Sequence, residues 1–128
     1  MANENILRIV SKKASGDLSG YQYYAVYLSA NETVAVCNGY THRPTGVLYD
    51  KPAAAGRACA VVRSGECPVV LSGTVVAGTR IMPTTDGTWI EAPAGWPAYG
   101  EMQEGGSSGE IRKANIFCEG GGSYTLSP

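Results

Sequence analysis

Residues 56–73 read GRACAVVRSGECPVVLSG, and this stretch decides the fold class. Its side chains alternate between two faces, with Ala58, Ala60 and Val62 on one and Cys59, Val61 and Arg63 on the other. A period of two is that of a β-strand, because a helix would place its apolar residues three and four positions apart. We expect strands at 57–63 and 67–71, joined as a hairpin by a turn at 64–66.

Similar short apolar runs continue on both sides, cut by Gly, Pro, Asp and Ser about every eight to twelve residues. Further strands are predicted at 6–10, 21–29, 33–37, 46–49, 74–76, 79–82, 88–90 and 110–119. The pairs Asn38-Gly39 and Asp86-Gly87 predict tight turns. Residues 53–56 could pass for a scrap of helix, but so short a helix cannot offset the cost of nucleation, and a turn is favoured. The pattern predicts an all-β fold, a small β-barrel or β-sandwich of short antiparallel strands with long loops and extended termini.

The length of 128 residues fits a single β domain, 1–128. Within it we expect an N-terminal arm at 1–5, a loop at 11–20, a long Gly/Pro loop at 93–109 that contributes little to the core, and a flexible C-terminal tail at 120–128. The long loop carries Trp96 and Tyr99, and we expect both to be exposed anchors because interfaces are enriched in such residues.

Charge and hydropathy argue against two classes of partner. The formal net charge is −1 and 16% of residues are charged, so there is no basic surface to favour nucleic acid. The first residues lack the basic start and apolar run of a signal peptide, and no stretch reaches the ~18 apolar residues of a membrane span. We expect a product of the cytoplasm that binds neither nucleic acid nor membrane.

The four cysteines, Cys37, Cys59, Cys67 and Cys118, include no Cys-x-x-Cys pair, and there is one histidine, which argues against a structural zinc site. A tight turn at 64–66 would pair Cys67 with residue 62 or 63 and not with Cys59, which disfavours a disulfide within the hairpin. We interpret the cysteines as reduced, half-buried small hydrophobes.

Catalytic chemistry has few candidates. His42 is the one general base that titrates near neutrality, and a Cys–His pair is arithmetically possible, although buried, inert thiols are favoured. Paired carboxylates could come from Asp50, Asp86, Glu91 and Glu101, but Asp50 and Asp86 are better explained as turn residues. The Gly-rich segments 105–109 and 120–122 lack the features of a phosphate loop and look like linkers. We predict no catalysis, no cofactor and no bound metal.

The aromatic residues allow two interpretations. Eight tyrosines and two tryptophans could line a sugar-binding face. The favoured alternative is that Tyr21, Tyr23, Tyr24 and Tyr27 pack along a strand and that Trp89 lies in the core.

Four runs in the centre of the chain carry a family resemblance: GVLYDKPAAAG at 46–56, ACAVVRSG at 58–65, VVLSG at 69–73 and VAGTRI at 76–81. This region resembles the small capsid decoration (cement) proteins of tailed bacteriophages. The resemblance implies a β-barrel or β-tulip-like domain that binds the outside of the assembled head and stabilises it, commonly as a homotrimer. The implied partners are the major capsid protein and two further copies of this chain, and the implied location is the outer capsid surface of the virion.

In such a protein, arms and sheet edges can add a strand to a capsid protein. We therefore expect the N-terminal segment from Ala2 to Lys13 and the 93–109 loop to make shell or trimer contacts. The predicted partner-binding residues are Ile6, Arg8, Lys12, Lys13, Tyr24, Trp96 and Tyr99. Two other classes stay open. A carbohydrate- or receptor-binding module of a head fibre or tail adhesin needs exposed, coplanar aromatic rings, and a small hydrolase needs His42 beside a cysteine or serine.

Overall fold

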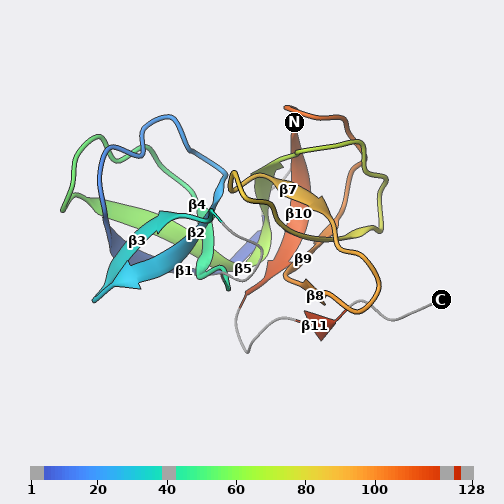
Figure 1. Ribbon diagram of the computed structural model, residues 1–128, viewed down its shortest axis with the longest axis horizontal. Helices are drawn as coiled ribbons and strands as arrows, with labels where there is room; N and C mark the ends of the chain where they lie inside the picture. The colour runs from blue at the N-terminus through green and yellow to red at the C-terminus, as the bar shows by residue number, and fades with distance from the viewer. Residues whose placement is uncertain (1–4, 39–42, 119–122, 125–128) are drawn as a thin grey trace.

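The computed structural model describes residues 5–38, 43–118 and 123–124, which form strands and turns without a helix (Figure 1). The strands are β1 (Asn5–Ala14), β2 (Ala25–Ala30), β3 (Thr33–Val36), β4 (Gly46–Leu48), β5 (Ala58–Val70), β6 (Arg80–Pro83), β7 (Trp89–Glu91), β8 (Pro97–Ala98), β9 (Gly100–Met102), β10 (Ile111–Phe117) and β11 (Ser123–Tyr124). The predicted all-β class is confirmed.

The first five strands close into a barrel in the order β1-β3-β2-β4-β5, with β5 returning to β1. The closing contact is a short parallel pairing of β1 with β3, at Lys13–Thr33 and Ala14–Val34. Small apolar side chains fill the interior: Ala14, Leu18, Val26, Val34, Leu48, Cys59 and Val61. We call this unit the first barrel.

A second unit is built on the far half of β5, in the order β5-β10-β9-β6-β7. It curls until β7 meets the residue after β5, where Leu71 bridges Trp89 and the Ser72 N–H donates to the Trp89 carbonyl at 2.7 Å. We call it the second barrel. Its core holds larger side chains, including Leu71, Ile81, Met82, Trp89, Tyr99, Met102 and Ile116. Ala25, Val47 and Val62, on the outer face of the first barrel, belong to this second core and join the two units.

Strand β5 crosses from one barrel to the other as 13 continuous residues, so the predicted hairpin with a turn at 64–66 is wrong (Figure 1). Gly65 pairs with Ile6 of β1 on one side and with Ile116 of β10 on the other, which holds the chain extended through the Ser-Gly-Glu segment. Its φ of 106° explains why glycine occupies this point. The turn preference of Ser64, Gly65 and Glu66 is overridden because both edges of β5 pair with neighbouring strands here.

The continuous strand also changes the argument about the cysteines. All four are free and buried, more deeply than the half-buried state we predicted. Cys59 and Cys67 lie eight positions apart on β5, which is roughly 26 Å at the rise of a strand. That separation is far beyond the reach of a disulfide, so the predicted lack of a bond between them holds for a reason other than hairpin register.

Three other boundaries differ from prediction. β1 runs on to Ala14, so the loop predicted at 11–20 begins later. The strand predicted at 21–29 begins at Ala25, because Tyr23 has a left-handed φ of 70° and its N–H donates to the Leu48 carbonyl at 2.6 Å. The stretch 74–76 makes one isolated bridge, between Val75 and Gly106.

The segment 93–109 is not the coreless loop we predicted. It contains β8 and β9, and three of its side chains, Ala98, Tyr99 and Met102, are buried in the second core. The strands predicted at 33–37, 46–49 and 110–119 and the Asp86-Gly87 hairpin are confirmed, and Trp89 is fully buried as expected. The predicted Asn38-Gly39 turn, most of the N-terminal arm and most of the C-terminal tail lie outside the described residues.

Candidate functional site

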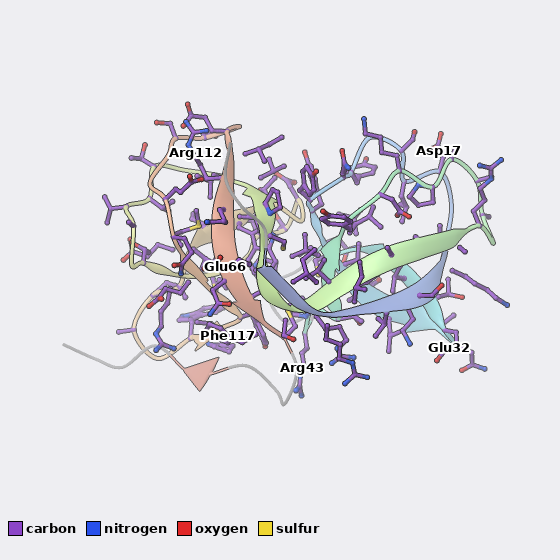
Figure 2. The ribbon with its side chains drawn as sticks, turned by 180° about the vertical axis from the view of Figure 1, so that it is seen from behind. Asp17, Glu32, Arg43, Glu66, Arg112 and Phe117 are labelled. Atoms are coloured by element: carbon purple, nitrogen blue, oxygen red, sulfur yellow. The ribbon has the colours of Figure 1, made fainter. Side chains whose placement is uncertain are left out.

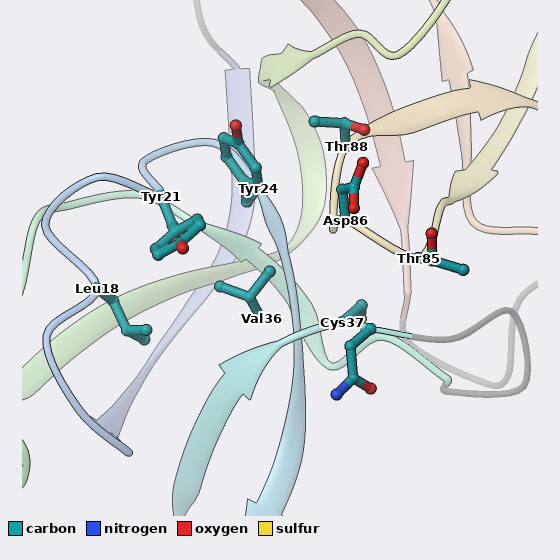
Figure 3. Close-up of a pocket in the computed structure, with 9 residues that line it drawn as sticks. Leu18, Tyr21, Tyr24, Val36, Cys37, Thr85, Asp86 and Thr88 are labelled. Atoms are coloured by element: carbon teal, nitrogen blue, oxygen red, sulfur yellow. The ribbon is translucent and has the colours of Figure 1, made fainter.

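An open groove of about 610 Å³ lies where the loop before β2 and the end of β3 face the β6–β7 turn (Figure 3). It is lined by Leu18, Tyr21, Tyr24, Val36, Cys37, Asn38, Thr85, Asp86 and Thr88. Its volume falls within the range of about 300–1,000 Å³ typical of small-molecule sites. We call it the junction groove.

The first barrel supplies an apolar and aromatic wall. Tyr21 and Tyr24 meet edge to face, with ring centroids 5.2 Å apart and planes at 85°. The Tyr24 N–H donates to the Tyr21 carbonyl at 3.1 Å, which ties the two residues into one turn. Leu18 and Val36 complete this wall, and Tyr21 is 40% exposed at the rim. With an angle of 85° between their planes, the rings of Tyr21 and Tyr24 are nearly perpendicular and not coplanar.

The β6–β7 turn supplies a polar wall. Thr84 organises it: its hydroxyl accepts the Asp86 N–H at 3.1 Å and lies 2.9 Å from the Thr88 hydroxyl. The Asp86 side chain is exposed and lies beside Thr88, across the groove from Tyr24 (Figure 3). No described residue pairs with its carboxylate, so both oxygens can accept hydrogen bonds from a ligand.

Gly87 fixes the distance between the two walls. Its carbonyl accepts the Ala25 N–H at 2.7 Å, a direct bond from the second barrel to the first. With φ at 83°, a β-carbon placed there would lie 2.4 Å from Val36 Cγ1 and 3.2 Å from Tyr24 Cδ2. Glycine is therefore required by both backbone conformation and close approach.

The groove is suited to binding and offers little nucleophilic chemistry. Burial raises the pKa of the Cys37 thiol at its base from 9.0 to about 12, so it stays protonated and weakly nucleophilic at neutral pH. His42, the predicted general base, lies outside the described residues. Among the residues that are described, no group of three or more His, Cys, Asp or Glu side chains is arranged to hold a metal ion.

The predicted partner-binding residues lie on three separate parts of the molecule. Ile6, Arg8, Lys12 and Lys13 are on β1, Tyr24 is in the junction groove, and Trp96 is 42% exposed in the turn before β8. The predicted exposure of Tyr99 is wrong. It is 7% exposed because it lies between β8 and β9 and donates its N–H to the Ile81 carbonyl at 2.9 Å.

One edge of β1 is largely open. β1 pairs with β5 along most of its length but with β3 only at its last two residues, so from Ile6 to Lys12 no described strand covers the second edge (Figure 2). Ile9 on this segment is 46% exposed. Lys12 is held at the end of the open segment by an ion pair with Glu32, with Nζ to Oε1 at 3.1 Å.

Sequence reasoning missed the junction groove. Asp86 was interpreted as a turn residue, which it is, Asn38 was assigned to a turn and Thr88 to a strand, and none of these residues nor Leu18 was predicted to line a site. The lining residues come from two segments, 18–38 and 85–88, that lie 47 to 70 positions apart, and only the docking of the Gly87 turn brings them together.

Comparison with known proteins gives a fold and no sequence relative. No model of a known protein family matches the chain, and no curated protein matches it in sequence. Among solved structures, the chain is similar to the head fiber gp8.5 N base of bacteriophage phi29, with a TM-score of 0.63 and 16% identity. The match covers 94% of this chain and 98% of the other, so it includes both barrels. At this identity the likeness shows a shared fold. None of the described residues forms a helix that could cross a membrane.

Proposed function

We propose that this protein is a structural component of a bacteriophage virion that binds the outside of the assembled capsid and stabilises it without catalysis. The observation that carries the proposal is the fold shared with the head-fibre base across almost the full length of both chains. The resemblance of the strand and turn pattern of residues 46–81 to capsid decoration proteins points the same way, although no family model and no curated protein matches the chain.

The open edge of β1 is the surface we assign to shell contact. The Lys13 N–H donates to Glu32 on the β3 side at 2.8 Å, and the Ala14 N–H donates to Arg57 on the β5 side at 2.8 Å. Because successive N–H groups alternate in direction along a strand, the N–H of Ser11 points the same way as that of Lys13, toward the open edge. An extended segment of the major capsid protein can add there as a further strand, with main-chain hydrogen bonds supplying affinity.

Assembly as a homotrimer fits this mode of binding. One added strand makes few contacts, and three linked copies convert weak single contacts into avidity when all three sites can be engaged together. A protein that binds the assembled shell and not free subunits stabilises the shell by mass action. Avidity from three linked copies and stabilisation of the shell by mass action apply equally to a free-standing decoration protein and to the base of a head fibre.

The test is co-sedimentation of the purified protein with phage heads assembled without it, together with light scattering of the protein alone. We expect saturable binding to heads and a trimer in solution. Ser11→Pro removes the outward N–H and should abolish strand addition, whereas the matched control Ser11→Ala keeps the N–H and should bind like the unaltered chain. Circular dichroism checks that both variants fold.

A second readout does not depend on the proline variant. Hydrogen exchange at the Ser11 amide should slow when heads are present. Failure of the unaltered protein to sediment with heads would refute the function, and equal head binding by both variants would move the contact away from β1.

A further inference from the structure

We propose that the junction groove is a binding site for a neutral saccharide. This role is additional to shell attachment and does not rest on it, because the groove and the open edge of β1 are formed by different residues. The inference is drawn from the two unlike walls of the groove.

Sugars are amphipathic in the same sense as this groove. A pyranose ring has apolar C–H faces and a polar rim of hydroxyl groups. The wall formed by Leu18, Tyr21, Tyr24 and Val36 offers apolar surface to the C–H faces. Because the two tyrosine rings are nearly perpendicular, the exposed ring of Tyr21 is the one that can stack on a sugar, and the wall is not a coplanar aromatic platform. The opposite wall offers the hydroxyl groups of Thr85 and Thr88 and the carboxylate of Asp86 to the hydroxyl rim, and such a mixture of apolar lining with a few polar groups is typical of small-molecule sites.

Asp86 determines the kind of sugar. Its carboxylate has no partner among the described residues and is therefore an acceptor for ligand hydroxyl groups, and hydrogen bonds to a charged group are stronger than neutral ones. Among the described residues that line the groove there is no Lys, Arg or His, so none of them would balance an acidic ligand. Uronic acids, sialic acids and phosphate groups would meet an uncompensated negative charge, which argues against acidic sugars and for neutral ones among the common saccharides.

The groove is also held in shape before a ligand arrives. The Thr84 hydroxyl orders the polar wall, the Tyr24–Tyr21 hydrogen bond orders the aromatic wall, and Gly87 fixes the spacing between them. Because the walls are already ordered, binding costs less conformational entropy. This lower cost helps a ligand that makes few contacts, such as a sugar, to bind.

The experiment is saturation-transfer NMR on the full chain with four probes: maltose, lactose, chitobiose and glucuronic acid, each at millimolar concentration. We expect transfer to at least one of the neutral disaccharides and none to glucuronic acid. Titration then gives a Kd for the best probe. A deoxy analogue that lacks a bonded hydroxyl should bind worse, because it leaves a polar group of the groove unpaired.

Two variants remove the proposed contacts without disturbing the core. Asp86→Asn keeps a residue that suits the turn and removes the charge, and should raise the Kd about tenfold. Tyr21→Ala removes the exposed ring and should raise it roughly five- to tenfold. The matched controls are Glu91→Gln, an exposed carboxylate elsewhere on the same hairpin, and Trp96→Ala, an exposed aromatic outside the groove. Both controls should leave the Kd unchanged.

Three results would overturn the proposal: no transfer to any neutral sugar, a Kd insensitive to both groove variants, or a Kd that changes equally in the controls. A trilysine peptide tests the competing possibility of a cationic peptide site. If trilysine binds, loses affinity in Asp86→Asn and is not displaced by any neutral sugar, the groove is a peptide site and the saccharide assignment is wrong. Head binding measured on the same variants separates the two functions, because it should be unaffected by either groove variant.

Discussion

The two barrels share a strand but are built differently. The first barrel closes through strand pairing around a core of small side chains such as Val26, Val34 and Val61. The second barrel is made of strands of three or four residues beside β10 and the end of β5, and it closes through a single bridge from Leu71 to Trp89. Its core is also richer in large side chains.

This difference shows how a short chain can form two closed units. Where the strands are long, backbone pairing defines the barrel and small residues fill it. Where they are short, a few large side chains hold turns and strand ends together, and Trp89 is the largest of the fully buried ones. The comparison predicts that the second barrel depends on single residues more than the first does.

The largest expected effect is that of Trp89→Ala, which should lower the free energy of unfolding by about 3–5 kcal/mol by leaving a cavity in the second core. Val61→Ala, the matched change in the first core, should cost about 2 kcal/mol. Urea unfolding measures both. Because β5 belongs to both barrels, amide exchange should accelerate in β2 and β10 alike for each variant. Loosening confined to the altered barrel would show that the two units unfold separately.

Gly87→Ala tests the contact between the barrels. The added β-carbon meets Val36 Cγ1 at 2.4 Å in a backbone with φ of 83°, and we expect a loss of about 2–4 kcal/mol. Gly95→Ala is the control, since Gly95 has φ of 87° with open space around it and should cost only the strain, about 1 kcal/mol. Thermal unfolding compares them. Equal losses would mean that the close approach at Gly87 contributes nothing.

Raising the pH should weaken the second core through Cys37. Burial raises the pKa of this thiol from 9.0 to about 12, so between these values the folded chain holds a proton that the unfolded chain releases. Stability is complete below pH 9 and falls as pH rises toward 12. The urea midpoint should drop from pH 8 to pH 10, and less steeply in Cys37→Ala. The same slope in both proteins would exclude Cys37 as the cause.

The smallest effect concerns the closure of the first barrel. Lys12 and Glu32 form an ion pair at 3.1 Å, but the Glu32 side chain is 70% exposed, so a double-mutant cycle with Lys12→Ala and Glu32→Ala should give about 0.2–1 kcal/mol. The coupling should diminish in high salt. A coupling well above this range would mean that side chains, and not the β1–β3 ladder, close the barrel.

The sequence predicts the fold where local and non-local forces agree. The alternation of apolar and polar residues predicted β3, β4 and β10, and the Asp86-Gly87 pair predicted the turn of the β6–β7 hairpin. It failed at 64–66, where turn-forming residues lie between two strands that pair with both edges of the chain. That pairing is set by residues 51 to 59 positions away, Ile116 on one side of Gly65 and Ile6 on the other, so no local pattern carries it.

The site was less accessible to prediction than the fold. Tyr24 was singled out as a strand aromatic and lies in the junction groove, but its neighbour across the groove, Asp86, had a sufficient explanation as a turn residue. The burial of Tyr99 was missed because glycines and prolines around it suggested a loop, whereas short β8 and β9 dock there on the second core. A pocket formed by two docked turns has no periodicity to detect.

The passage of β5 through both barrels also limits how the protein can be dissected. A fragment that ends within residues 58–70 would expose strand edges that are covered in the intact chain, and a fragment without β5 would lack the backbone on which both sheets are laid. We therefore expect that neither barrel can be produced as a separate, stably folded fragment. Insertions or labels belong at turns with open space around them, such as those at Gly56 and Gly109, which lie outside β5.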